Sequence, residues 1–332
     1  MSLIQHLMRG KLRVTAALLM LSFVGCTGFD PASPSSNSKH PSQVVDVTGA
    51  RAIHHAMGVT QITGTPQRIV VLTNEATDSI LSLGITPIGA VKSWSGDPYY
   101  DYIQAEMVEV PIVGDEFQPN LERIVSLQPD LIIGSKVRQG QFYEQLSAIA
   151  PTVFSETIGA SWKDNLRLYA KALNREAEAE AVLAEWDERV AVFKTKMGER
   201  LSQEVSVVRF LPDMIRIYYK DSFPGQILEE VSLSRPASQD KNEFADAISI
   251  EQITLVEGDI LFYFTLENGD RNELDQAAAV EQQWLNHPLW QKLEVVQKGN
   301  AHLVSDITWT TAGGIQAANL LLDDLYKYFE IQ

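Results

Sequence analysis

Cationic and aromatic side chains follow, or interrupt, several short apolar runs of this sequence. Trp94 and Arg138 each stand in a polar loop just after such a run. Loops beyond the carboxyl ends of parallel strands are where α/β folds bind ligands. Arg216 and Tyr218 alternate with isoleucines, so a strand would place both on one face. An arginine beside a tyrosine can bind a carboxylate or hydroxamate oxygen. Each residue also has a purely structural alternative. Trp94 could cover the core of its lobe, and Arg138 could be a solvated surface residue. Arg216 could form an ordinary ion pair while Tyr218 packs beside it.

Motifs of the common enzyme classes are missing from the sequence. The 332 residues contain no GxSxG, HExxH, Walker A or GxGxxG pattern. His54 and His55 are adjacent, so a strand would point them to opposite faces. No group of His, Asp and Glu has the spacing of a bare zinc or manganese site, although ligands distant in sequence could converge. The sequence therefore predicts a protein that is not an enzyme.

The composition narrows the class of protein further. A net charge of −16 argues against nucleic-acid binding, which needs a basic surface. The 45% apolar content fits a globular chain. A single cysteine excludes an intramolecular disulfide framework and Cys-rich metal sites.

The N-terminal residues have the pattern of an export signal. Arg9, Lys11 and Arg13 precede the short apolar run 14–24, and Gly25 and Cys26 follow at once. A cysteine at this place resembles a bacterial lipobox, in which it is lipidated and becomes the new N-terminus. Phe23 departs from the usual leucine, and a buried N-terminal helix is the alternative. We predict a lipoprotein signal over 1–25, lipidation of Cys26, and a flexible Ser/Pro-rich tether over 26–50.

Apolar strands alternate with helical stretches in the remaining chain, which predicts an α/β fold of two parallel-sheet, Rossmann-like lobes. The expected division is an N-terminal lobe over 51–161, a helical segment over 162–202 and a C-terminal lobe over 203–332. Apolar residues at helical spacing between 183 and 201 predict one helix that joins the lobes, or an amphipathic helix packed on one of them.

One internal repeat supports two related lobes. The pattern of a polar cap, a glutamate, an isoleucine and an aspartate before a strand occurs at 120–132 and again at 249–261. It puts Glu122 and Glu251 in equivalent places. A chance match of a common helix–strand pattern is the alternative.

The sequence resembles the iron–siderophore substrate-binding lipoproteins of ABC importers, within the wider class that binds ferric siderophores, haem and cobalamin. The matching stretches, in order, are HAMGVTQITGTPQRIVVL (55–72), LGITPIGAV (83–91), QPNLERIVSLQPDLIIG (118–134), YEQLSAIAPTV (143–153), DSFPGQILEEVSLSRP (221–236), HPLWQKL (287–293) and WTTAGGIQAANLLLDDLYKY (309–328). The resemblance implies two lobes bridged by one long helix, with the ligand cleft between them. It also implies capture of a ferric siderophore, of hydroxamate or citrate type. Haem or cobalamin is the alternative ligand, and an envelope metal-dependent hydrolase is a more distant one.

The resemblance assigns a role to several residues of this chain. It brings Arg138 to the siderophore, with Lys136 as a weaker alternative, and places the strand of Arg216 beside the ligand. A ligand contact is also expected near Glu116, which could instead pair with Arg138. The full set of expected ligand-binding residues is Trp94, Glu116, Arg138, Arg216, Tyr218, Phe223, Phe244 and Trp309. Of these, Trp309 is expected to line the cleft, whereas Phe223 and Phe244 could be simple packing residues.

A siderophore supplies the oxygen ligands of its own iron, so we expect no metal site and no cofactor in the protein. The resemblance implies that Glu122 and Glu251 dock onto the membrane permease, with Glu229 and Glu230 as alternatives on the second lobe. The expected partners are therefore a ferric siderophore, the permease, and the membrane through the lipid alone. The resemblance places this protein, a monomer, on the periplasmic side of the cell envelope.

Overall fold

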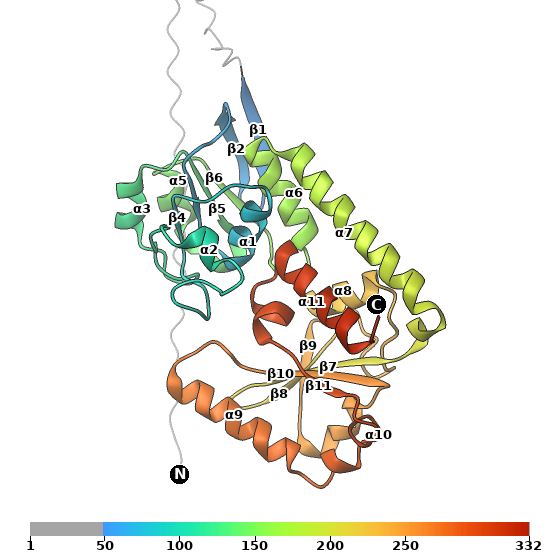
Figure 1. Ribbon diagram of the computed structural model, residues 1–332. Coiled ribbons are helices and arrows are strands. Elements are labelled where there is room, and N and C mark those ends of the chain that lie inside the picture. The colour runs from blue at the N-terminus through green and yellow to red at the C-terminus, as the bar shows by residue number, and fades with distance from the viewer. Residues whose placement is uncertain (1–48, 332) are drawn as a thin grey trace, which may run out of the picture. The chain divides into compact units, whose positions relative to one another are not determined.

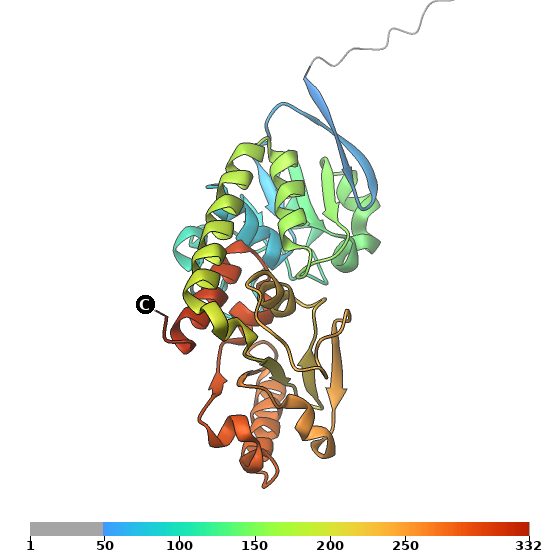
Figure 2. The ribbon, with the colours of Figure 1, turned by 90° about the vertical axis from the view of Figure 1, so that its right-hand side faces the viewer.

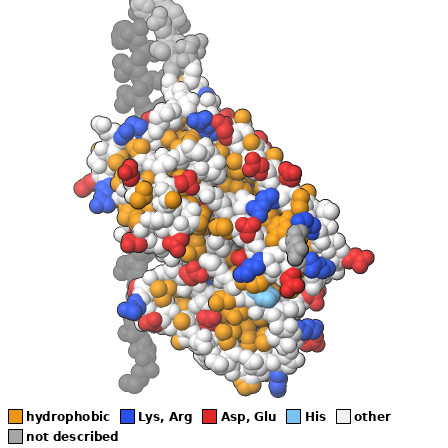
Figure 3. Space-filling view, viewed as in Figure 1, with side chains coloured by type: hydrophobic (Ala, Val, Ile, Leu, Met, Phe, Trp, Pro, Cys, Tyr) orange, Lys and Arg blue, Asp and Glu red, His pale blue; other side chains and the backbone are white. Residues whose placement is uncertain are grey.

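A computed structural model describes residues 49–331, all of which lie in a single unit of the chain. The predicted signal, the predicted lipidation site Cys26 and all of the predicted tether up to residue 48 lie outside the described residues. No described helix is long and apolar enough to span a membrane. Acidic and basic side chains are interspersed over the face drawn in Figure 3.

The first sheet has four parallel strands in the order β4-β3-β5-β6. They are β3 (Ile69–Val71), β4 (Gly89–Ala90), β5 (Leu131–Ser135) and β6 (Thr152–Ser155). Their side chains are buried on both faces, which explains the continuous apolar runs. The helices of this region are α1 (Asn74–Ser82), α2 (Gln104–Met107), α3 (Leu121–Leu127), α4 (Lys136–Gln139), η1 (Gly140–Phe142), α5 (Tyr143–Ser147) and α6 (Trp162–Leu173).

The second sheet has five strands in the order β11-β10-β7-β8-β9. They are β7 (Val205–Phe210), β8 (Ile215–Tyr218), β9 (Ala245–Ile248), β10 (Ile260–Thr265) and β11 (Ala301–Leu303). The α/β prediction is confirmed, but this sheet is mixed because β8 runs antiparallel to both of its neighbours. The reason is the short connection 211–214, which allows a hairpin and is too short for a parallel crossover.

The helices around the second sheet are short, apart from α9. They are η2 (Gly198–Ser202), α8 (Phe223–Glu230), η3 (Ile250–Val256), α9 (Arg271–Leu285), η4 (Trp290–Lys292), α10 (Glu294–Gln297) and the π-helical turn η5 (Ile307–Thr311). The last helix, α11 (Ile315–Tyr328), packs against both α1 and α8.

The helical stretch between the sheets consists of two helices. Asn174, in the left-handed conformation with φ 58°, separates α6 from α7 (Glu176–Met197). The 22 residues of α7 span about 33 Å. Figures 1 and 2 show α7 running from beside α6 to the end at which the chain enters β7. The buried face of α7 includes Trp186 and Phe193, which belong to the apolar residues at helical spacing between 183 and 201.

The two copies of the predicted repeat each end in an aspartate that precedes a strand, β5 in the first sheet and β10 in the second. Asp130, before β5, accepts the backbone N–H groups of Gln67 and Arg68 at 2.9 and 2.8 Å. Asp259, before β10, accepts the N–H of Glu204 at 2.9 Å. Each aspartate thus ties its own strand to the segment that leads into a neighbouring parallel strand, β3 or β7.

A hairpin precedes the first sheet. It pairs β1 (Ala50–His55) with β2 (Gly58–Thr63) in antiparallel register. Arg51 donates hydrogen bonds to the carbonyl oxygens of Lys171 and Ala172, at the last turn of α6. This arginine supplies donors to carbonyl groups that a helix end leaves without partners.

Candidate functional site

A cavity of about 490 Å³ is lined by segments that follow strands of both sheets. The first sheet contributes the segments after β3, β4, β5 and β6, and the second contributes β7, β8 and the segments after β8, β10 and β11. The carboxyl ends of parallel strands thus converge on one space, as is usual for ligand sites in α/β proteins. Its volume is that of a small-molecule pocket.

An aromatic and arginine wall forms the side of the cavity nearer the first sheet. Trp94 and Phe117 contact each other with ring centroids 5.5 Å apart. The guanidinium carbon of Arg138 lies 4.9 Å from the Phe117 ring centroid. A guanidinium stacked in this way keeps its donors aligned at little entropic cost.

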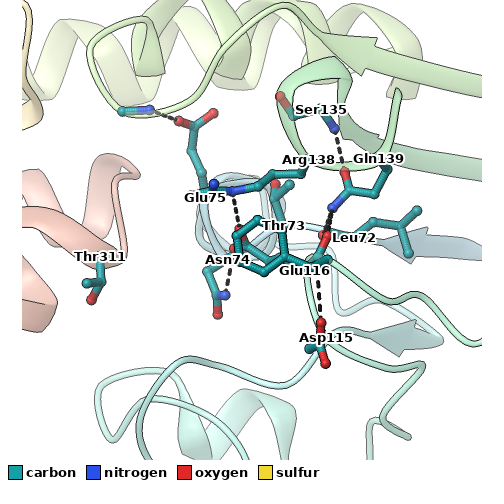
Figure 4. A network of polar contacts seen from close by, with 12 residues as sticks. Leu72, Thr73, Asn74, Glu75, Asp115, Glu116, Ser135, Arg138, Gln139 and Thr311 are labelled. Carbon is teal, nitrogen blue, oxygen red and sulfur yellow. Dashed lines mark hydrogen bonds and ion pairs between the residues drawn. The ribbon is translucent and has the colours of Figure 1, made fainter. Parts of the chain in front are cut away.

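Glu116 fixes the position of Arg138 through an ion pair (Figure 4). Its side chain is 2% exposed, and its Oε2 accepts from Arg138 Nε at 3.0 Å. Its Oε1 accepts the backbone N–H and the side-chain amide of Asn74 at 2.8 and 2.7 Å. The Gln139 side chain bonds the Glu116 carbonyl and holds the loop in place. Glu116 lines the cavity and pairs with Arg138, which was one of the two expectations for it.

Two arginines lie directly opposite each other in the second sheet. Arg209 on β7 and Arg216 on β8 are register partners, and both line the cavity. Arg209 donates to Asp306 at 2.6 Å and to Asn268 at 3.2 Å. Within residues 49–331, Arg216 forms no ion pair and bonds only the Met214 sulfur, at 3.7 Å.

Aromatic rings complete the side formed by the second sheet. Tyr218 lines the cavity with Arg216, as expected from their alternation, and its ring packs edge-on against Phe244 at 5.5 Å. Phe244 is 54% exposed although it lines the cavity. Phe223, at the start of α8, also lines it and is 3% exposed.

Trp309 is not in the cavity wall, so its expected place in the cleft is wrong. It is fully buried, its Nε1 donates to Asp324 at 2.9 Å, and its ring lies 4.7 Å from that of Phe262. The π-helical turn η5 directs the Trp309 side chain into the core, whereas the next four residues, 310–313, line the cavity.

The predicted ligand-binding set did not include six polar residues of the cavity: Glu75, Arg209, Asp221, Asn268, Thr310 and Thr311. Arg209 has a signal in the sequence, because it is a charged residue within the apolar run 205–210. Glu75 lies in the first turn of α1 and Asn268 in a loop after β10, where such residues are common and carry no distinctive signal.

Glu75 is a buried acid in this wall. Its oxygens accept from the Gly159 N–H at 2.5 Å and from the Asn165 amide at 2.6 Å. Burial, together with the nearby carboxylates Glu116 and Asp78, outweighs the effect of these hydrogen bonds and raises the pKa of Glu75 to about 8. Glu75 is therefore mostly neutral at pH 7.

Glu122 and Glu251 lie away from the cavity lining, exposed in the first turns of α3 and η3. The Lys136 side chain is also exposed, and its Nζ pairs with the Glu156 Oε1 at 2.6 Å. Within residues 49–331, no group of three or more His, Cys, Asp or Glu side chains is placed to hold a metal ion.

Comparisons with known proteins agree with this arrangement. Residues 69–304 match the family described as periplasmic binding protein. The chain is 49% identical to the "Probable siderophore-binding lipoprotein YfiY" of Bacillus subtilis, over 90% of this chain and 93% of that one. It is 35% identical to the achromobactin-binding periplasmic protein of Dickeya dadantii, over 79% of this chain and 86% of that one. The structure of Staphylococcus aureus SirA complexed with staphyloferrin B has a TM-score of 0.78 and 36% identity, over 85% of this chain and 99% of that one.

Proposed function

This chain belongs to the periplasmic binding protein family, and we propose that it captures a ferric siderophore and delivers it to an ABC transporter permease for iron uptake. It binds and releases the complex without catalysing a reaction. The cavity between the two sheets is the binding site, and the relatives named for siderophores support this choice of ligand.

The facing pair Arg209 and Arg216 is the observation that carries the proposal. Arg209 is already paired with Asp306, whereas Arg216 has no anionic partner among the described residues. An anionic ligand at this pair supplies the missing counter-charge and gains charge-assisted hydrogen bonds. The pair therefore favours a siderophore with ionised oxygen groups, such as the citrate type, because the guanidinium fork matches a carboxylate.

Each wall gives the ligand a different kind of contact. Arg138 has one nitrogen on Glu116 and presents its other donors next to the Phe117 ring. Trp94, Tyr218, Phe223 and Phe244 supply apolar surface for the carbon skeleton of the complex. The iron keeps the oxygen ligands of its siderophore, so the protein recognises the whole complex.

A haem ligand fits this cavity less well. Haem proteins hold iron through an axial His, Tyr, Cys or Met. No described histidine, cysteine or methionine lines the cavity, and Tyr218, which does line it, is only 2% exposed. We therefore rank the siderophore above haem and cobalamin.

The exported protein acts on the periplasmic side of the envelope as a monomer, anchored by lipid at Cys26. Glu122 and Glu251 present the loaded protein to basic residues of the permease, one glutamate from each half of the chain. Such exposed charge pairs orient docking more than they add affinity. Removal of the anchor by Cys26→Ser should release the protein from washed membranes.

Native mass spectrometry against a panel of iron complexes tests the function. The panel contains citrate-type, hydroxamate and catecholate siderophores, together with haem and cobalamin. We expect a one-to-one complex with a citrate-type ferric siderophore. Binding of haem alone, or of none of the panel, would contradict the proposal.

A further inference from the structure

One buried acid in the wall of the cavity has no cationic partner among the described residues. Glu75 is 2% exposed and lines the cavity beside Gly159. Within the described part of the chain, none of the ion pairs includes Glu75, and Arg138 is already bound to Glu116. A buried carboxylate without a cation is costly, so the group is more stable when neutral.

The hydrogen bonds of Glu75 are compatible with a proton on the carboxyl group. Gly159 and Asn165 both donate to it, one to each oxygen. A neutral carboxyl group can accept both of these bonds and still has one O–H to donate. The cavity that Glu75 lines is where an acceptor for this O–H can lie.

The surrounding groups favour the neutral form. Glu116, from the loop after β4, and Asp78, on α1 itself, oppose a negative charge at Glu75. The phenol of Tyr169 on α6 is a further neighbour, and burial raises its pKa well above the ordinary value, so it stays neutral. Arg138 lines the same cavity from α4. Burial is the largest effect and raises the pKa of Glu75 to about 8.

We propose that Glu75 is a specificity-determining residue, which binds as a neutral acid and donates its O–H to an anionic oxygen of the iron complex. No proton is transferred, because it stays on Glu75 throughout binding. Loss of this proton replaces a donor by a negative charge that repels the ligand. Binding therefore weakens as Glu75 ionises. This inference rests on the proposed function, since it assumes an anionic ligand in the cavity.

The pH dependence of affinity tests the inference in the full-length protein. The dissociation constant of iron-loaded staphyloferrin B is measured from pH 6 to 9.5 for the wild type, Glu75→Gln and Glu185→Gln. The ratio of the wild-type constant to that of Glu75→Gln cancels the ligand's own titration. With a pKa of about 8, this ratio should rise by about 30-fold between pH 7 and 9.5. Glu185, exposed on α7, is the charge-matched control, and its variant should follow the wild type.

A ratio that stays constant with pH, or one that falls, overturns the inference while the proposed function stands. Absence of binding by the wild type to every complex of the panel contradicts the proposed function instead. Circular dichroism shows whether Glu75→Gln is folded.

A second measurement needs no ligand and no binding-competent variant. Infrared spectra of the wild type, titrated through the same pH range, should contain a buried carboxylic-acid carbonyl band that disappears with a midpoint near pH 8. Isotopic labelling of glutamate, with the Glu75→Gln spectrum as reference, assigns the band. If labelled wild type has no such glutamate band at pH 7, the inference is wrong whatever the ligand.

Discussion

The carboxylate of Asp78 accepts the backbone N–H of Gln316 at 2.9 Å, although 238 residues separate the two in the chain. The same carboxylate accepts the N–H of Ala317 at 3.1 Å and the hydroxyl of Tyr102 at 2.8 Å. Asp78 on α1 thus supplies acceptors to the first N–H groups of α11, which an isolated helix leaves without partners. The helix that follows the second sheet is thereby fixed to the first sheet's helical layer, beside the binding cavity.

Gly314→Ala should destabilise this junction. A Cβ at Gly314 would lie 2.2 Å from the Asp78 Oδ1, so the carboxylate must move away from the start of α11. We expect a loss of about 2–4 kcal/mol in the free energy of unfolding, from overpacking and lost hydrogen bonds.

Gly140→Ala is the matched control, because the nearest neighbour of its Cβ would be Lys136 Cγ at 3.6 Å. It should change stability by less than about 0.5 kcal/mol in urea unfolding. Equal stability of the two variants would argue against a tight Asp78–Gly314 contact.

The stability of the folded chain should depend on the proton of Glu75. Burial raises its pKa from 4.5 to about 8, so the folded state holds the proton more tightly than the unfolded state. Its contribution is fully present below pH 4.5 and is lost as the pH rises through about 8. Between these values the wild type should lose up to about 1.4 kcal/mol per pH unit relative to Glu75→Gln. Parallel stability curves for the two proteins in chemical unfolding would contradict this.

Arg138 and Arg216 should differ in what their loss does to the fold. Both substitutions to alanine should weaken siderophore binding at least tenfold. Arg138→Ala also leaves Glu116 buried without its cation, which should cost about 2–3 kcal/mol of stability. Arg216 has no such partner within residues 49–331, so Arg216→Ala should unfold like the wild type.

The double variant Arg138→Ala, Glu116→Gln provides the control. It should recover part of the lost stability, without recovering binding. Calorimetry measures the siderophore affinity of each variant, and thermal unfolding measures its stability. Unchanged affinity in both single variants would remove these arginines from the binding site.

Trp94 should report ligand binding and Trp309 should not. Trp94 lines the cavity, whereas Trp309 is buried against Phe262. Ligand-dependent quenching of tryptophan fluorescence should therefore shrink strongly in Trp94→Phe and persist in Trp309→Phe. The second variant should instead lower stability by about 1 kcal/mol, since it loses the hydrogen bond to Asp324. Loss of quenching in Trp309→Phe alone would contradict the assigned positions.

Glu122 and Glu251 should matter for transport and not for binding. Both are exposed and outside the cavity lining. The double substitution to alanine should reduce uptake of the iron complex by cells at least fivefold, while the purified protein keeps its affinity. A double variant of exposed Glu185 and Glu188 on α7 removes the same charge and should transport normally. Normal uptake by the first variant would refute the docking role.

The sequence predicted the strands around the cavity because their apolar runs are local and continuous. Arg216 and Tyr218 share a face in the structure because side chains alternate along any strand. The antiparallel direction of β8 was missed, although the short connection before it indicates a hairpin. The prediction that Trp309 lines the cleft was wrong, because the family resemblance does not specify to which side of a turn a side chain points.

The sequence by itself determined the α/β class, the order of elements and, with the family resemblance, seven of the twenty residues that line the cavity. These depend on hydrophobic periodicity and on the position of polar residues at strand ends, which are local properties. Only the tertiary structure decided that Glu116 neutralises Arg138, that Arg209 faces Arg216, and that Glu75 lies buried with no cationic partner in the described part of the chain. Such pairings join residues far apart in the chain, and their energies depend on burial and distance, which no local pattern contains.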